Sequence, residues 1–346
     1  MQERKPISIV KKLLTAVIIP IIFFILLEGG ARFAGIEVIP STLEQDPQSQ
    51  AIDLMKKRGI FTEDPLLFWR FIPIDGKETW LVPGKLWINM LGLRSTQNDF
   101  SKPVDLRIIA LGDSCTFGWK LASDSTYPSL VEKGLREIDP DRRIDVINAG
   151  VPGYSSYQTR LQLETELIGI KSHLALIMLG WNDIWGRSSK PDCESENSKV
   201  TRLIRTKLLN LRFIELLRCG IEKLTPTKNI HGGSVRVSPD QFRENITAII
   251  YLCRSKDIRP ILLLQPHRPL PHTECVGELL HPRMDEYNSI TKDLGNILKV
   301  PVIDIPKRFK REPNQVELFM DCIHLTAEGT EILANTVLES LRQNGI

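Results

Sequence analysis

The stretch RIIALGDSCTFGWK, residues 107–120, contains a hydrophobic run that ends at Leu111 and is followed at once by Gly112, Asp113 and Ser114. A short apolar run that ends in a turn is typical of a buried strand in a parallel sheet. In such sheets, functional side chains collect where the strands end. Ser114 therefore belongs either to a plain tight turn or to a nucleophile site at the edge of a sheet, and partners elsewhere in the chain must decide between the two.

Apolar runs alternate with helical segments throughout the rest of the chain. This alternation predicts an α/β fold, a three-layer α/β/α sandwich around a five-stranded parallel sheet. Ser238 and Asp240 are plausible caps for the helix expected at residues 239–257. The further strands are expected at residues 144–148, 174–179, 261–265 and 300–305, and the helices at 126–138, 157–170, 239–257, 283–299 and 326–343.

The composition is that of an ordinary globular protein. The 346 residues are 42% hydrophobic and 25% charged, and the net charge is +3. A fully disordered chain is excluded by this balance, and so small a net charge provides no field for nucleic-acid binding. Six cysteines are too few for a disulfide scaffold. Isolated thiols are expected, and Cys193 with Cys275 is the pair to test for a disulfide.

The N-terminus has four basic residues before an uncharged run at residues 13–27. We interpret residues 1–35 as a signal anchor or transmembrane helix with the rest of the chain exported, because the basic residues precede the apolar run. Flanking residues must extend this run to the roughly 20 residues of a spanning helix. A signal peptide cleaved after residues 29–31, which would secrete the protein, is the alternative, and a buried soluble helix is another.

Two further regions complete the expected organisation. Residues 36–104 are interpreted as a connector and a small strand-rich extension, because aromatic and proline-containing pieces alternate with turns from residue 61 onward. Residues 105–346 contain the strand–helix alternation, interrupted by an insertion at 185–238. The basic stretch within this insertion is expected to be a helix packed on the domain, and a lid or a membrane-surface helix is the alternative.

The other strand ends supply partners for Ser114. His324 can accept the proton of the Ser114 hydroxyl, and Asp321 can orient the His324 imidazole from the same turn. The side chain of Asn182 and the backbone N–H groups of Gly153 and Ser114 can form an oxyanion hole. These residues lie in NAGVPG after the second strand (148–153), GWND after the third (180–183) and DCIH before the last helix (321–324).

The blocks GDS, NAGVPG, GWND and DCIH, in this order, resemble those of the SGNH or GDSL hydrolase superfamily, and the resemblance covers residues 105–343. INMLGLRS, residues 88–95, also resembles a segment of membrane-anchored bacterial members. The resemblance implies a flavodoxin-like sheet. It also implies Ser114 as nucleophile, Asp321 and His324 as the rest of the triad, and Ser114, Gly153 and Asn182 as oxyanion donors.

The choice of Gly153 over Gly150 also comes from the resemblance, because the family's glycine donor lies five residues after the asparagine of this block. Two positions depart from the family pattern. Cys115 replaces a leucine and is expected to start a helix and point inward, and Leu325 replaces a proline. Neither departure removes a catalytic position.

The expected function is a serine-dependent carbohydrate or lipid O-acyl esterase that forms a covalent acyl-enzyme at the cell envelope. An O-acyltransferase that uses the same triad on an envelope polysaccharide is the first alternative. An inactive, membrane-tethered binding module is the second. Trp181, Trp185 and His267 are candidates for substrate contacts, since two flank Asn182 and the third follows the fourth strand.

No metal or cofactor is expected. The histidines and cysteine at residues 267, 272, 275 and 281 match no zinc spacing, and no glycine-rich phosphate motif follows a strand. The sequence indicates no nucleic-acid partner and leaves the oligomeric state open.

Overall fold

The computed structural model describes residues 47–185, 192–195, 235–269 and 281–346, together with Ile18, Ile19, Phe23, Leu26, Gly29 and Gly30, which are helical. Nearly all described residues belong to one compact unit, Gln48–Ser195 with Gly233–Ile346. Within the described residues, no helix is both long and apolar enough to cross a membrane. Most of the predicted anchor and the basic stretch of the predicted insertion lie outside the described residues.

Five parallel strands form the central sheet in the order β6-β5-β7-β8-β9. The predicted α/β fold with a five-stranded parallel sheet is thereby confirmed. Gly112 at the end of β5 lies opposite Gly150 of β6 and Met178 of β7, so the carboxyl ends of the three central strands meet at one edge. The strands are β5 (Leu106–Gly112), β6 (Ile144–Gly150), β7 (Leu174–Met178), β8 (Arg259–Leu263) and β9 (Val302–Ile303).

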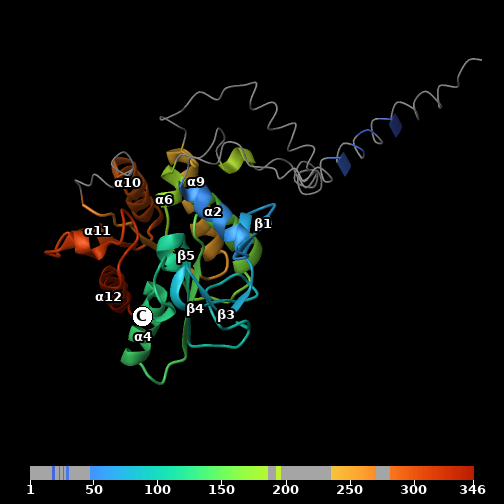
Figure 1. The fold of residues 1–346 in the computed structure, drawn as a ribbon. Coiled ribbons are helices and arrows are strands. Elements are labelled where there is room, and N and C mark those ends of the chain that lie inside the picture. The colour runs from blue at the N-terminus through green and yellow to red at the C-terminus, as the bar shows by residue number, and fades with distance from the viewer. Residues whose placement is uncertain are drawn as a thin grey trace, which may run out of the picture. The chain divides into compact units, whose positions relative to one another are not determined.

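Alternate side chains of each strand enter two separate hydrophobic cores, because successive residues of a strand point to opposite faces. Ile109 and Leu111 of β5 join one core, and Ile108 and Ala110 join the other. Helices α5 (Ser156–Gln162), α9 (Pro239–Arg254) and α10 (His281–Leu298) cover the first face. Helices α4 (Tyr127–Ile138), α11 (Ile305–Phe309) and α12 (Ala327–Gln343) cover the second (Figure 1).

Several of the helices have defined caps or end earlier than the sequence predicts. Ser238 caps α9 in a reciprocal pair with Gln241, as predicted, while Asp240 lies in the first turn. The helix predicted at 157–170 is shorter than expected, because α5 ends at Gln162 and a π-helical turn, Leu163–Leu167, follows it. Helices α3 (Ser114–Phe117) and α6 (Trp181–Ile184) begin at the carboxyl ends of β5 and β7.

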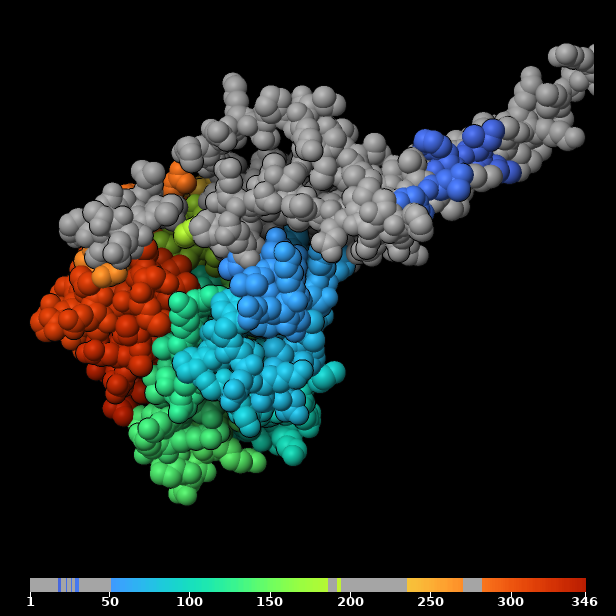
Figure 2. All heavy atoms as spheres, viewed as in Figure 1, coloured from blue at the N-terminus to red at the C-terminus, as the bar shows by residue number. Residues whose placement is uncertain are grey.

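The N-terminal extension, described from residue 47 to 104, packs on the same face as α5 and α9. Its aromatic side chains Phe61, Trp69 and Phe71 belong to the core cluster that includes Ile109 of the central sheet. Figure 2 shows the extension, blue to cyan, against the green residues that follow β5. The predicted short strands are confirmed as two antiparallel hairpins after α2 (Pro47–Lys57): β1 (Phe61–Asp64) with β2 (Phe68–Phe71), and β3 (Ile74–Thr79) with β4 (Val82–Ile88).

Candidate active site

Ser114 lies at the sharp turn between β5 and α3. The Asp113 side chain caps α3 by accepting a hydrogen bond from the Cys115 N–H at 2.9 Å. A side chain at Gly112 would not fit, because its Cβ would lie 2.7 Å from the Met178 carbonyl oxygen. The nucleophile candidate is thereby held at the carboxyl edge of the sheet with only 8% of its surface exposed.

A tight turn before α12 holds Asp321 and His324. The turn is closed by an antiparallel bridge between Phe319 and Leu325. The Asp321 carboxylate accepts hydrogen bonds from the backbone N–H groups of Ile323 and His324, at 2.9 and 2.8 Å. The spacing of three residues therefore lets one carboxylate orient both the turn and the imidazole. Leu325, which replaces the family's proline, is buried in the second core.

Ser114, His324 and Asp321 form a continuous hydrogen-bonded chain. Oγ of Ser114 lies 2.8 Å from Nε2 of His324, and Nδ1 of His324 lies 2.7 Å from a carboxylate oxygen of Asp321. Partial burial disfavours the charged form of Asp321, but the hydrogen bond and the attraction from His324 outweigh it and lower the pKa of Asp321 to about 2. Asp321 is therefore ionised at neutral pH and can stabilise an imidazolium ion.

The glycine loop after β6 presents an available backbone donor beside this chain. Gly153 has a φ of 84°, a left-handed conformation that favours glycine. Its N–H has no acceptor among the described residues. The N–H of Gly150, in contrast, donates to the Asn148 side chain at 3.1 Å. The choice between the two glycines as oxyanion donor is therefore consistent with the geometry.

Asn182, from the GWND block, also lies near this glycine loop. It lies in α6, and its amide nitrogen donates to the Tyr154 carbonyl at 3.0 Å, which fixes the side chain next to Gly153. The structure thus brings the four sequence blocks to one edge of the sheet. In this arrangement a serine hydroxyl, a histidine and a carboxylate are hydrogen-bonded in series, and an asparagine amide lies at the same edge of the sheet.

Residues 110–332 match the GDSL-like lipase/acylhydrolase family. The chain belongs to this family. It is a serine hydrolase that acts on ester bonds.

Individual relatives of this GDSL-like hydrolase are distant. It is 24% identical over 219 residues to the uncharacterized lipoprotein YqeF of Bacillus subtilis (strain 168), and the match covers 58% of this chain and 71% of that protein. The lipase/acylhydrolase of Enterococcus faecalis has 19% identity and a TM-score of 0.48, covering 69% of this chain and 96% of that one. The acetylxylan esterase Axe2 of Geobacillus stearothermophilus has 17% identity and a TM-score of 0.46, covering 68% and 94%.

The N-terminal extension of this GDSL-like hydrolase contacts the glycine loop directly. The indole N–H of Trp69 in β2 donates to the Pro152 carbonyl at 3.2 Å. In return, the Tyr154 hydroxyl donates to the Trp69 carbonyl at 2.6 Å. Because a peptide unit is planar, the bond to the Pro152 carbonyl also sets the direction of the Gly153 N–H. The predicted sites did not include Trp69, since an aromatic residue in a strand is typical of a core position.

Arg236 supports the same loop from the other side. Its side chain is fully buried and pairs with Asp192 at 2.9 Å. It also donates to the Gly153 carbonyl at 2.8 Å and to the Gln158 side chain at 2.6 Å. A buried guanidinium requires such partners, so the network holds the backbone on both sides of Gly153. Arg236 lies within the predicted insertion at 185–238, where no local pattern marked it.

Two buried carboxylates underlie the site. Burial raises the pKa of Asp113 to about 6, although the Cys115 N–H and His324 favour its charged form. Burial likewise raises the pKa of Asp183 to about 7, against two hydrogen bonds from the Ser156 N–H at 3.0 Å and one from its hydroxyl. Asp183 therefore anchors the start of α5 to the strand end that carries Asn182.

The INMLGLRS segment supports the loop after α3. Arg94 is buried and donates to the carbonyls of Phe117 and Gly118 at 2.7 and 2.9 Å. Its backbone N–H donates to the Asn148 carbonyl at 3.2 Å. Burial lowers the pKa of Arg94 to about 10. Arg94 thus joins the segment after Ser114 to strand β6, a role that the quoted segment alone did not reveal.

The three predicted substrate residues lie in different environments. Trp181 is only 1% exposed and belongs to the first core, so it does not offer an open surface. Trp185 is half-buried at the end of the described segment. His267 meets the Trp181 ring edge-on, with centroids 6.3 Å apart, and lies 3.4 Å from Asp285. Substrate contact by these residues stays a prediction.

The cysteines include both thiols and a disulfide. Cys193 is a thiol that lies 2.7 Å from the Gln241 amide nitrogen, as in the expectation of isolated thiols, so the Cys193–Cys275 pair that was singled out for testing is not a disulfide. Cys322, between Asp321 and His324, is in a disulfide whose partner lies outside the described residues. Cys115 is partly buried, as expected for an inward-pointing residue, and burial raises the pKa of its thiol.

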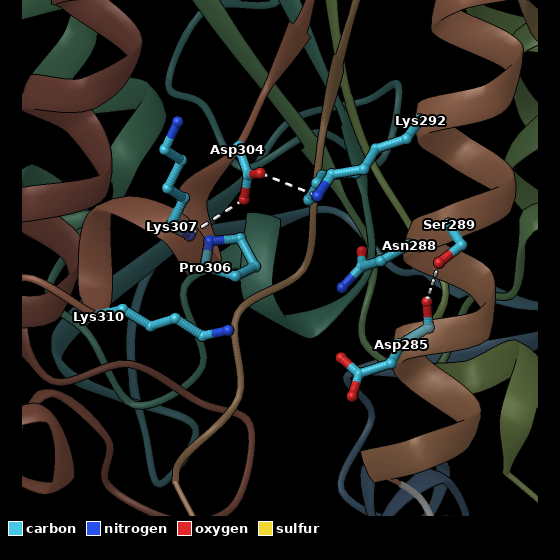
Figure 3. A pocket seen from close by; sticks show the side chains of 9 residues that line it. Asp285, Asn288, Ser289, Lys292, Asp304, Pro306, Lys307 and Lys310 are labelled. Atoms are coloured by element: carbon cyan, nitrogen blue, oxygen red, sulfur yellow. Dashed lines mark hydrogen bonds and ion pairs between the residues drawn. The ribbon is translucent and has the colours of Figure 1, made fainter.

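A cavity of about 320 Å³ lies between α10 and α11 at the same edge of the sheet. Figure 3 shows the Lys310 side chain pointing into it, with Asn288 and Asp285 on the facing helix. Lys292 and Asp304 in its wall pair at 2.9 Å. No triad residue lines this cavity, and its lysines and carboxylates largely offset one another.

Proposed function

We propose that this GDSL-like hydrolase is an O-acyl esterase that removes a small acyl group from an envelope carbohydrate or lipid through a covalent acyl-enzyme. The observation that supports the proposal most directly is the hydrogen-bonded chain from Ser114 through His324 to Asp321. A serine hydroxyl is a weak nucleophile unless an adjacent base removes its proton. His324 Nε2 is within hydrogen-bond distance of that proton.

In the first step, Ser114 Oγ attacks the ester carbonyl carbon while its proton moves to His324 Nε2. The carbonyl oxygen becomes an oxyanion, which in this proposal binds the N–H groups of Ser114 and Gly153 and the Asn182 side chain. The intermediate then collapses, the bond to the alcohol oxygen breaks, and the alcohol leaves with the proton from His324. Asp321 stays ionised and stabilises the imidazolium ion.

In the second step, water replaces the alcohol. His324 takes a proton from the water, whose oxygen attacks the acyl carbon of the Ser114 ester. The second oxyanion collapses, the bond to Ser114 Oγ breaks, and Ser114 regains its proton from His324. The products are the free alcohol and a carboxylic acid, with no redox change and no external cofactor.

Three observations support an exported, envelope-associated location. The apolar run at residues 13–27 follows a basic flank, as in an export signal or anchor. The Bacillus subtilis relative is named a lipoprotein. Cys322 is in a disulfide, and disulfides persist mainly in oxidising compartments. We therefore propose that the hydrolase acts outside the cytoplasm on an envelope ester.

A fluorophosphonate labelling experiment on the full chain tests the proposal. Mass spectrometry is expected to locate the adduct on Ser114, and Ser114→Ala and His324→Ala are expected to abolish it. An assay of acetyl ester hydrolysis by the same proteins should show the same dependence. A folded protein that is neither labelled nor active would overturn the esterase, and acyl transfer to an added sugar faster than hydrolysis would identify a transferase.

A further inference from the structure

Trp119, in the loop after α3, lies directly against the triad. Its ring is stacked on the His324 imidazole, with centroids 5.8 Å apart and planes inclined by 24°. Its backbone N–H donates to the Ser114 carbonyl at 3.0 Å. The position of the indole is therefore fixed relative to both the nucleophile and the base.

Trp80 of the N-terminal extension continues this aromatic surface. It lies in the turn between β3 and β4 and meets Trp119 edge to face, with centroids 5.9 Å apart and planes at 82°. The Lys120 N–H donates to the Leu81 carbonyl at 3.2 Å, which ties this turn to the loop of Trp119. The Arg58 guanidinium lies 6.0 Å from the Trp80 ring centroid. Two perpendicular indoles thus extend outward from the triad.

The exposure and chemistry of these indoles indicate a ligand. Trp80 is 38% exposed, although tryptophan side chains are on average highly buried. Within the described part of the chain, neither Trp80 nor Trp119 has an acceptor for its indole N–H. The surface therefore combines apolar ring area with unused hydrogen-bond donors, which suits a ligand that is apolar on one face and carries oxygen acceptors around its edge.

A sugar ring has this combination, because its C–H groups form an apolar face and its hydroxyl and ring oxygens surround it. A lipid chain offers no acceptors for the indole N–H groups. It would also have to lie beside the Arg58 guanidinium, which is next to the Trp80 ring and belongs to an exposed residue. The surroundings therefore favour a carbohydrate over a fatty acyl chain.

We propose that Trp80 and Trp119 form a subsite for a pyranose ring of an O-acylated carbohydrate, held so that its acyl group reaches Ser114. This inference rests on the proposed esterase function and names its substrate class. It also assigns the N-terminal extension a part in substrate selection, because Trp80 comes from the extension and Trp119 from the nucleophile loop.

The first test compares two esters in the full-length enzyme: partially O-acetylated xylotetraose and vinyl acetate, which has no sugar. Trp80→Ala is expected to lower the ratio of kcat/KM for the sugar ester over that for vinyl acetate about ten-fold, mainly through KM. Trp80→Phe keeps an aromatic face and should restore part of this ratio. Tyr251→Ala removes an aromatic residue of α9 that is 55% exposed, and should leave the ratio unchanged.

The second test measures binding without catalysis. Ser114→Ala protein is titrated with unacetylated xylotetraose and with the N-acetylglucosamine tetramer, followed by calorimetry. At least one probe is expected to bind, and adding Trp80→Ala should weaken it about ten-fold or more. Binding of neither probe, or an equal loss of both ester activities in Trp80→Ala, overturns the subsite. An enzyme that hydrolyses neither ester overturns the esterase instead, while the titration still decides the subsite.

Discussion

Replacing Trp69 by phenylalanine tests whether the N-terminal extension sets the geometry of the oxyanion hole. The indole N–H donates to the Pro152 carbonyl at 3.2 Å, and the same planar peptide unit carries the Gly153 N–H. Phenylalanine fills most of the volume but leaves the Pro152 carbonyl without this donor. The peptide unit can then rotate, so the Gly153 N–H loses its fixed direction toward the oxyanion.

The expected magnitude follows from burial. Trp69 is 1% exposed, so the lost hydrogen bond leaves a buried acceptor, at a cost of about 1–3 kcal/mol in the free energy of unfolding. Removing a whole oxyanion donor lowers kcat by roughly 10²–10³-fold, and misdirecting one donor should lower it by a smaller factor, about ten-fold. KM should change little, because the oxyanion exists only in the transition state and the intermediate.

The assay measures kcat and KM on a simple acetate ester, together with urea unfolding of the same samples. Phe61→Leu is the matched control: Phe61 is 2% exposed in the same cluster and faces Trp69 across 6.4 Å. It is expected to lose stability while keeping kcat near the wild-type value. A folded Trp69→Phe enzyme with wild-type kcat would refute the reasoning, and so would an equal loss of kcat in the control.

Three further predictions concern the carboxylates and the disulfide. Asp321→Asn should lower kcat by up to about 10⁴-fold in steady-state assays, because an amide does not stabilise the imidazolium ion; a loss below ten-fold would remove Asp321 from the triad. Reducing the Cys322 disulfide should lower both kcat and the melting temperature, since Cys322 lies between the two triad residues of its turn; unchanged values after verified reduction contradict this. Burial raises the pKa of Asp183 from 3.8 to about 7 in the folded protein. Between these pH values the folded protein keeps this proton and the unfolded chain has lost it. The free energy of unfolding of the wild type therefore falls as the pH rises from about 4 to about 7, by up to about 4 kcal/mol. In Asp183→Asn, the free energy of unfolding measured with urea should no longer fall between pH 4.5 and pH 7.5. If both proteins lose the same stability between these pH values, Asp183 does not cause the fall.

The central sheet and the four blocks could be predicted because their signals are local. The runs of the two central strands β5 and β7 are buried along their whole length, and the chemistry-bearing residues come within a few positions of a strand end or helix start. Asp321 and His324 lie in one closed turn, so their spacing was informative without any knowledge of the fold. Gly153 could be chosen only by resemblance. Its left-handed conformation favours glycine, and its part as an oxyanion donor stays a prediction.

The supporting residues could not be predicted because their contacts depend on tertiary packing. Trp69 lies 83 residues from Pro152, and Arg236 lies 83 residues from Gly153. In the sequence, Trp69 is one aromatic residue in an aromatic strand, which is typical of core packing. Likewise, nothing local distinguishes a buried arginine that pairs with Asp192 from a surface one.

These contacts bear on whether residues 105–346 can act as a separate domain. The extension places Phe61, Trp69 and Phe71 in the core that covers one face of the central sheet, and it also supplies the Trp69 donor and the Trp80 surface. Removing residues 36–104 would expose that core and leave the glycine loop without its partner. We therefore expect a chain that begins at residue 105 to aggregate or to lose cooperative unfolding. A soluble truncated chain with wild-type kcat would show instead that the hydrolase fold orients Gly153 without the extension.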